Sequence, residues 1–379
     1  VLYKNGINDY LWRQIKTLSS NLTAKIKTKH GITREIKIND SIRQGGVLSV
    51  MMYALLMDEI AKEVENKKIG IPIAGTNTVM GCLLWMDDVV LVHNTPEGLQ
   101  QLLDITNDFA KKYHIEFGKD KSKFMVVGAN YKKNFNLGDL VIEHTDKYKY
   151  LGEILIETCS LEKQIIEIKQ KAEAALQTIF TIAGDKNFKG LEMKTIWKLV
   201  DSCILPVLTY SSETWKMKKG EINKINQIFD QILKRILMTP ITTPREVLYI
   251  ETGLLDLKHL IELKQVLAEN RLERTKNDLI DSILNTTAKN SWKDRVTKTR
   301  EKYTDVEVQF LPKKFAKRFM NEKVRTECRN EMVEVGSKPM RPKKKVKFLV
   351  DNRKDALQLK VPKYMTELPR SDVSVIFKA

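Results

Sequence analysis

The sequence of 379 residues, 42% of them hydrophobic and 30% charged, is long and apolar enough to fold into two or three domains with a substantial core. Its 65 lysines and arginines against 48 aspartates and glutamates give a formal net charge of +17, which favours nucleic acid as partner, although a ribosomal, chromatin or anionic-membrane role fits the same excess. Cys82, Cys159, Cys203 and Cys328 lie far apart without a CxxC pair, so neither a disulfide framework nor a zinc knuckle is indicated and a reducing, intracellular compartment is expected.

The first part of the chain predicts a helix followed by a basic β-ribbon. Asn8 is a suitable N-cap, and apolar residues recur at helical spacing from Leu11 to Leu18. Two alternating segments, 22–28 and 34–40, flank His30-Gly31 and should pair as a ribbon. A glycine-containing loop then leads into an amphipathic helix that ends near residue 68.

Two adjacent aspartates interrupt the apolar run CLLWMDDVVLV, which extends from Cys82 to Val92. The apolar residues on either side predict two short buried strands with Asp87 and Asp88 at the tip of their hairpin. No lysine or arginine lies between Gly81 and Val92, and an unpaired buried carboxylate is costly, so the pair needs water or a cation. Turn chemistry alone is the competing interpretation, but tight hairpin turns favour Asn-Gly or Asp-Gly. The pattern favours a site for a hard divalent cation, Mg²⁺ or Mn²⁺, together with phosphate oxygens.

The rest of the chain predicts a mixed segment followed by helices. A helix should begin at Thr95-Pro96 and continue to Tyr113, and further strands are expected at 124–127, 140–142 and 148–156. Helices are expected at 161–183, 191–205, 221–238 and 254–273. We therefore predict an α+β domain over residues 1–158, a helical domain over 159–250 and a basic helical C-terminal region over 251–379.

The C-terminal region is strongly basic. Residues 291–345 hold 17 lysines and arginines against 8 aspartates and glutamates. The basic motif RPKKKVK at 341–347 lies at the end of this stretch. This composition suits either a solvated helix face with a linker or a nucleic-acid-binding tail. RPKKKVK is similar to a nuclear import signal, and the need to reach chromosomal DNA is the reason to expect a nuclear location after synthesis in the cytoplasm. The sequence shows no signal peptide and no apolar run of transmembrane length, so no membrane partner is expected.

Several motifs follow one another in an order that resembles the palm of reverse transcriptases, most closely those of non-LTR (LINE-type) retrotransposons. RQGGVLS at 43–49 resembles the family's Arg-Gln-Gly-x-x-Leu-Ser segment, and WMDD at 85–88 its aromatic-x-Asp-Asp box. KDKSK at 119–123 resembles its Lys-Thr/Ser segment, and YLG at 150–152 its primer-grip turn. VLTYSSETW, beginning at Val207, is similar to a sequence of the helical thumb. The likeness covers most of residues 1–250 and implies a partial palm, an antiparallel sheet with helices, followed by a helical thumb.

The resemblance implies an RNA-directed DNA polymerase. In such an enzyme a primer 3′-hydroxyl attacks the α-phosphate of a dNTP, so the implied partners are an RNA template, a DNA primer and dNTPs. Two divalent ions held by carboxylates stabilise the attacking and leaving oxygens. Asp87 would be the principal metal ligand and Asp88 an auxiliary one.

The resemblance also implies contacts to the template and the nucleotide. Gln44 and Gly45 would lie under the templating pair, where glycine permits close backbone approach. Arg43 would contact phosphate or template, or alternatively form a structural salt bridge. Trp85 and Met86, which stand where the family usually has Tyr or Phe followed by Ala, would belong to the same binding surface.

Two further roles follow from the resemblance. Lys121 would protonate or neutralise the leaving pyrophosphate. A surface lysine between Lys119 and Lys123 is the alternative. Tyr150, Leu151 and Gly152 would support the primer end, or the apolar Tyr-Leu pair would simply be part of the core.

One segment of the family has no counterpart here. A strand of the type Asp-x-x-x-Ala-Phe-Asp is absent before Arg43, and Asp9 and Asp40 lie at a helix start and in a loop. The terminal SVIFKA resembles the stretch that leads into a zinc knuckle. We therefore expect a segment of a retrotransposon polyprotein that does not polymerise DNA by itself. The alternatives are a non-catalytic nucleic-acid-binding protein derived from such an element and a helical scaffold whose charge is incidental.

Overall fold

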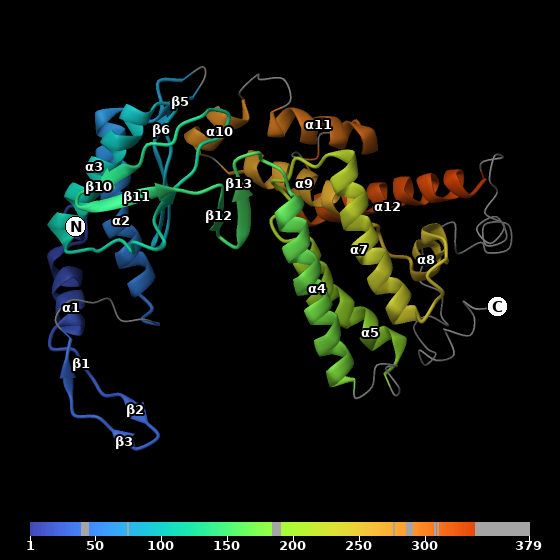
Figure 1. Ribbon diagram of the computed structural model, residues 1–379, viewed down its shortest axis with the longest axis horizontal. Helices are drawn as coiled ribbons and strands as arrows, with labels where there is room; N and C mark the ends of the chain where they lie inside the picture. The colour runs from blue at the N-terminus through green and yellow to red at the C-terminus, as the bar shows by residue number, and fades with distance from the viewer. Residues whose placement is uncertain are drawn as a thin grey trace. The chain divides into compact units, whose positions relative to one another are not determined.

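Helices and small sheets make up a mixed α+β protein in the computed structural model (Figure 1). The structure describes residues 1–38, 45–73, 76–183, 191–275, 277–285, 291–306, 308 and 311–337. The chain divides into two compact units: unit 1 is Val1–Phe124 with Asn130–Thr145, and unit 2 is Met125–Ala129 with Asp146–Ala379.

Unit 1 contains three helices and a set of short strands among its described residues. Its elements are α1 (Asp9–Ser19), β1 (Thr23–Ala24), β2 (Lys27–Thr28), β3 (Gly31–Ile32), β4 (Ile36–Lys37), α2 (Ser49–Lys67), β5 (Ile71–Pro72), β6 (Val79–Met80), β7 (Cys82–Trp85), β8 (Asp88–Leu91), α3 (Pro96–Tyr113), β9 (Lys123–Phe124), β10 (Phe135–Leu137) and β11 (Leu140–His144).

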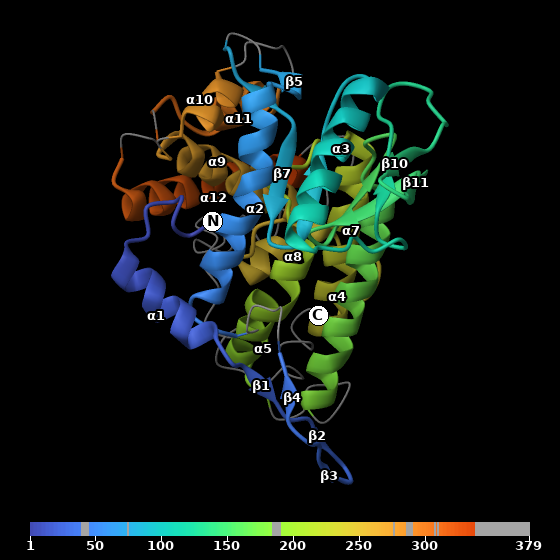
Figure 2. The same ribbon diagram turned by 90° about the vertical axis from the view of Figure 1, so that its left-hand side faces the viewer.

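The core of unit 1 lies between α2, α3 and the β7–β8 hairpin (Figure 2). The predicted start of α3 is confirmed: the Thr95 side chain accepts from the Gly98 N–H at 3.2 Å, and Pro96 occupies the first turn. Leu102 and Phe109 of α3 are buried with Ile60 of α2, because apolar residues at this spacing form one helical face. This packing fixes the two helices against one face of the hairpin.

The predicted basic ribbon is present and exposed. Antiparallel pairs join β1 to β4 and β2 to β3, with Lys27 opposite Ile32. Asn8 caps α1 as expected, since its side chain accepts from the Leu11 N–H at 2.9 Å, but α1 contains no buried residue. The part of the second ribbon segment beyond residue 38 lies outside the described residues.

A small sheet with strand order β10-β11-β9 completes unit 1. The strand predicted at 140–142 is confirmed within β11, which pairs antiparallel with β10. The strand predicted at 124–127 is wrong beyond Phe124, because β9 pairs only with the last two residues of β11. That pairing is parallel, whereas the sequence predicted an antiparallel sheet.

Unit 2 is mainly helical. Its elements are β12 (Lys147–Tyr150), β13 (Glu153–Ile156), α4 (Glu162–Ile182), α5 (Met193–Leu199), the π-helix η1 (Val200–Ile204), α6 (Leu205–Leu208), α7 (Lys219–Leu237), α8 (Arg245–Thr252), α9 (Leu257–Glu273), α10 (Asp278–Leu284), α11 (Trp292–Tyr303) and α12 (Lys313–Ser337).

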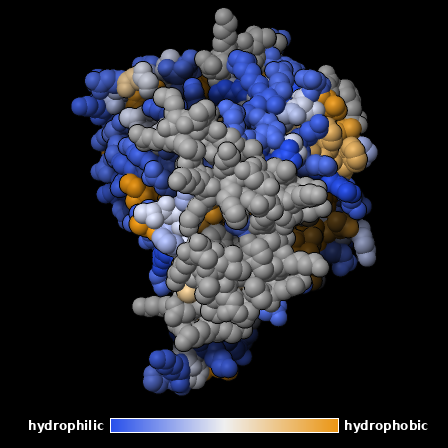
Figure 3. Space-filling view, turned by 90° about the vertical axis from the view of Figure 1, so that its right-hand side faces the viewer, coloured by the Kyte–Doolittle hydropathy of each residue, from blue (hydrophilic) through white to orange (hydrophobic). Residues whose placement is uncertain are grey.

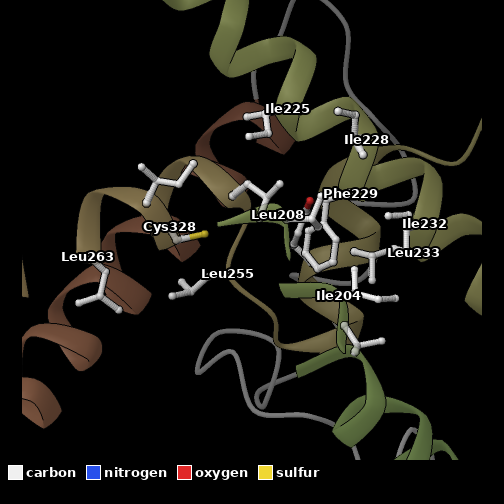
Figure 4. Packing of buried hydrophobic residues seen from close by; sticks show 14 of the residues in the cluster. Ile204, Leu208, Ile225, Ile228, Phe229, Ile232, Leu233, Leu255, Leu263 and Cys328 are labelled. Carbon is white, nitrogen blue, oxygen red and sulfur yellow. The ribbon is translucent and has the colours of Figure 1, made fainter. Parts of the chain in front are cut away.

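One hydrophobic cluster extends through these helices, from Leu161 before α4 to Met332 on α12 (Figure 4). Helices α4 and α7 lie side by side (Figure 1), and Phe229 of α7 is fully buried. The helix predicted at 191–205 is instead α5, a π-turn and α6, since the chain continues past Pro206 by placing it in the first turn of α6. Helix α8 follows directly on Pro244, its N-cap residue.

The compact units differ from the predicted domains. Residues 146–158 were expected with the N-terminal domain, but the β12–β13 hairpin packs on α4 and belongs to unit 2. The segments 159–250 and 251–379 were expected as separate parts, yet their described helices share the hydrophobic cluster of unit 2. Contacts between residues distant in sequence decide to which unit residues 146–158 belong, and they join the two helical segments into one unit.

Hydrophilic side chains make up most of the described surface on the face drawn in Figure 3. Within the described residues, no helix is both long enough and apolar enough to span a bilayer.

Candidate active site

The two aspartates lie at the tip of the β7–β8 hairpin, as the sequence predicted, but they differ in position. The strands pair antiparallel from Cys82 opposite Leu91 to Trp85 opposite Asp88. The turn is therefore Met86-Asp87, with Met86 at a φ of 54°, and Asp88 is the first residue of β8. Positive φ at a bulky residue is strained, and such strain is found often at functional sites.

The strands of this hairpin are half-buried, which corrects the prediction of two buried strands. Cys82 and Leu84 of β7 pack with Val89 of β8 on the core of α2 and α3. Leu83 and Trp85 point the other way and are 41% and 60% exposed. The reason is the period of two along a strand, because the described helices of the core cover only one face of this two-stranded sheet.

Asp87 and Asp88 are both exposed, so water solvates the pair. Neither carboxylate forms an ion pair with any lysine or arginine of the described chain. Two adjacent negative charges without a compensating cation repel one another and attract a divalent ion. Their oxygens are the ligands that Mg²⁺ and Mn²⁺ prefer, so the residues present fit such an ion.

Tyr53 of α2 is a neighbour of the aspartates that the sequence did not single out. Burial raises the pKa of its phenol, and the negative charge of Asp87 raises that pKa further. Tyr53 lies one helical turn after Ser49, which ends the RQGGVLS motif. This spacing was the signal in the sequence that could have found Tyr53, which the structure places near Asp87.

The glycine loop itself is described only from Gly45 onward, so Arg43 and Gln44 lie outside the described residues. Gly45 has a φ of 80°, and a Cβ added to it would meet nothing within 4 Å. Backbone conformation therefore explains the glycine in this structure, since L-residues rarely adopt that φ.

Lys121 is exposed in the turn that precedes β9, and its N–H donates to the Gly118 carbonyl at 3.2 Å. Its side chain lies near Gly118, where an added Cβ would approach the Lys121 stem at 3.8 Å. The neighbouring Lys123 is committed to an ion pair with Glu143 at 2.7 Å.

Tyr150, Leu151 and Gly152 lie in unit 2, in the hairpin that joins β12 to β13. Leu151 and Gly152 form its turn with φ values of 47° and 85°, and Tyr150 is opposite Glu153. Leu151 is 39% exposed, so it is a turn residue and does not belong to the hydrophobic core.

The VLTYSSETW segment holds this turn in place. Tyr210 donates its hydroxyl proton to the Leu151 carbonyl at 2.6 Å, and an added Cβ at Gly152 would lie 3.2 Å from the Tyr210 ring. Glu153 accepts from Ser211 Oγ at 2.5 Å and from the indole N–H of Trp215 at 3.0 Å. Sequence reasoning identified both motifs but not these contacts, because the motifs are far apart along the chain.

Known proteins are similar to this region of the chain. The sequence profile described as reverse transcriptase (RNA-dependent DNA polymerase) matches residues 6–155, which include Gly45, both aspartates, Lys121 and the YLG turn. The RNA-directed DNA polymerase from the mobile element jockey of Drosophila funebris is 21% identical over 247 residues, which are 62% of this chain and 26% of that protein.

Two other relatives are shorter matches. The Pol polyprotein from the type-2 retrotransposable element R2DM of Drosophila melanogaster is 30% identical over 122 residues, 29% of this chain and 11% of that protein. A transposon-derived protein of Caenorhabditis elegans is 25% identical over 170 residues, 43% of this chain and 59% of that protein. The chain thus spans between 11% and 59% of the length of these relatives.

Proposed function

Because residues 6–155 match the reverse transcriptase profile and retrotransposon proteins are similar to the chain, we propose that it is a segment of an RNA-directed DNA polymerase from a LINE-type retrotransposon. The observation that carries this proposal is the pair of exposed aspartates at the strained hairpin tip inside the matched residues. Its substrates would be dNTPs, with an RNA template and a DNA primer as partners.

Asp87 and Asp88 would hold the divalent cations of the reaction. The cations, Mg²⁺ or Mn²⁺, supply charge stabilisation for the attacking and leaving oxygens of the phosphoryl transfer. Asp87, in the turn and near Tyr53, would be the principal ligand. Asp88 is fixed by its pairing with Trp85 and would be the auxiliary ligand.

The other motif residues would position the nucleic acid and the nucleotide. Arg43, Gln44 and Gly45, which precede α2 in the sequence, would contact the templating pair and nucleotide. Trp85 and Met86 extend that surface: both are exposed, at 60% and 40%, beside the aspartates.

Lys121 would protonate or neutralise the pyrophosphate that leaves. Lys121 is exposed in the turn before β9, and its four-carbon stem is long enough to reach a phosphate. Tyr150, Leu151 and Gly152 would support the primer end, and the bonds from Tyr210 and to Glu153 would keep that turn rigid.

In this proposal unit 1 corresponds to part of the palm and the helices after Ile156 to a thumb with a basic C-terminal region. Nuclear localisation is the expectation that goes with access to chromosomal DNA.

The experiment that tests the proposal measures Mn²⁺ binding to the full chain by enhancement of water proton relaxation, with Mg²⁺ as competitor. We expect Asp87→Asn and Asp88→Asn each to weaken Mn²⁺ binding by about tenfold or more, a free energy of about 1.4 kcal/mol. Asp108→Asn, which removes an exposed carboxylate from α3, is the matched control and should bind as the wild type does. Equal loss in all three variants would sink the proposed site.

Primer–template binding separates this proposal from a non-catalytic binding protein. A polymerase site predicts binding that Mg²⁺ and dNTP strengthen and that Asp87→Ala weakens. A binding protein without catalysis predicts equal binding with and without Mg²⁺ and tolerance of Asp87→Ala. Primer extension on RNA, abolished by Asp87→Asn, would show that this chain holds a whole catalytic centre, contrary to our expectation from its sequence.

A further inference from the structure

A buried cluster of Asp256, His259 and Cys328 joins the start of α9 to α12 in unit 2. Asp256 is the N-cap of α9, His259 lies in the first turn, and Cys328 lies on α12. None of the three exposes more than 2% of its surface, and their ligand atoms lie within 4.8 Å of one another. Figure 4 shows Cys328 among the buried hydrophobic residues of unit 2.

Asp256 orients the imidazole of His259. Its Oδ1 accepts from Nδ1 at 2.6 Å and from the His259 backbone N–H at 2.9 Å, while Arg245 donates to Oδ2 at 3.1 Å. An ionised carboxylate only accepts hydrogen bonds, so Nδ1 carries a proton and Nε2 is the ring nitrogen left for a metal. This carboxylate–histidine arrangement is the one that typically supports a metal-binding imidazole.

The Nε2 atom of His259 is fully buried and has no hydrogen-bond partner among the described residues. Unpartnered buried polar atoms are rare in folded proteins, and an ion is one of the groups that satisfies them. Glu331 Oε2 lies 3.6 Å from this Nε2. Glu331 and Cys328 are three residues apart on α12, so both side chains are on the same side of that helix.

We propose that His259 Nε2, Cys328 Sγ and Glu331 bind one Zn²⁺ ion. Thiolate, imidazole and carboxylate together are zinc ligands, whereas Mg²⁺ prefers oxygen alone. Ligands at about 2.1 Å from a tetrahedral ion are separated by about 3.4 Å. The separation of 3.6 Å between Nε2 and Oε2 is close to that value. Binding would release the thiol proton of Cys328 and the proton on His259 Nε2 to solvent.

Glu331 would form the mouth of the site. Its side chain is 37% exposed, and both Lys258 and Lys302 donate to it at 3.0 Å. These bonds hold the carboxylate near His259 Nε2, and its partial exposure provides a route for the ion. The ion would cross-link α9 to α12, which is a structural role and is independent of polymerase activity.

Cobalt spectroscopy on the full chain tests this site. After chelation of bound metal, Co²⁺ alone is added, and thiolate-to-cobalt charge-transfer absorption is expected, with displacement by Zn²⁺. Cys328→Ser and His259→Asn should lose this absorption. Asp256→Asn should keep the absorption but weaken Co²⁺ binding by about 10–100-fold, since it only positions the imidazole.

The other cysteines provide the matched control. Replacing Cys82, Cys159 and Cys203 together by Ser should leave the absorption unchanged, because none of them belongs to the cluster. If Cys328→Ser does not fold, the triple variant still tests the site, because Cys328 is then the only thiol that could produce the absorption. Loss of the absorption in the triple variant, its persistence in folded Cys328→Ser, or its absence from the wild type would overturn the proposal. The last result is expected if Cys328 and His259 merely share a proton.

Discussion

Gly152 shows how one residue fixes the turn of the β12–β13 hairpin. Its φ is 85°, and an added Cβ would press on the Tyr210 ring at 3.2 Å, whereas Gly220 in the first turn of α7 has open space around it. We expect Gly152→Ala to lower the free energy of unfolding by more than about 1 kcal/mol, because both the backbone and the ring contact oppose a side chain.

Gly220→Ala is the control for that substitution. It should be neutral or raise the free energy of unfolding by up to about 1 kcal/mol, since alanine is the better helix former. Urea unfolding of the full chain measures both variants. An equal effect of the two would contradict the argument from the turn.

At the scale of elements, the aspartate hairpin depends on the helices under one of its faces. Leu102 of α3 is fully buried against that face, while Leu83 of β7 is 41% exposed on the other. We expect Leu102→Ala to lower the free energy of unfolding of unit 1 by about 2–5 kcal/mol, through lost contacts and a cavity. Hydrogen exchange of the hairpin amides should accelerate accordingly.

Leu83→Ala is the matched change on the exposed face, and its effect should stay within about 0.5 kcal/mol. If Leu83→Ala accelerated exchange as much as Leu102→Ala, the outer face would also be packed in solution. That outcome would contradict the half-buried hairpin.

At the scale of the whole molecule, the formal net charge of +17 predicts strong electrostatic binding to RNA. Lysine and arginine contacts to phosphates release counterions, so affinity should fall steeply with salt. For about six to ten such contacts, the loss between about 50 and 200 mM salt is about 10³–10⁵-fold. Filter binding of single-stranded RNA over a salt series measures the slope. A flat series would favour the scaffold whose charge is incidental.

Much of the local structure could be predicted from sequence. Periodicity and capping located α3 and α7 closely, and alternation with paired acids located the hairpin of Asp87 and Asp88. These features depend on neighbouring residues, whose conformational preferences are local. The motifs also carry the resemblance to reverse transcriptases, since they depend on residue type and order alone.

The tertiary structure decided which neighbouring residues lie in different elements and which residues distant in sequence are in contact. It assigned Asp88 to a strand and Asp87 to the turn, and it moved residues 146–158 into the helical unit. It also joined Glu153 to Trp215, and His259 to Cys328. Sequence alone determined the chemistry that each motif offers, because that follows from residue type and local order. Packing decided which motifs share a site, because only the folded chain brings distant side chains within hydrogen-bonding distance.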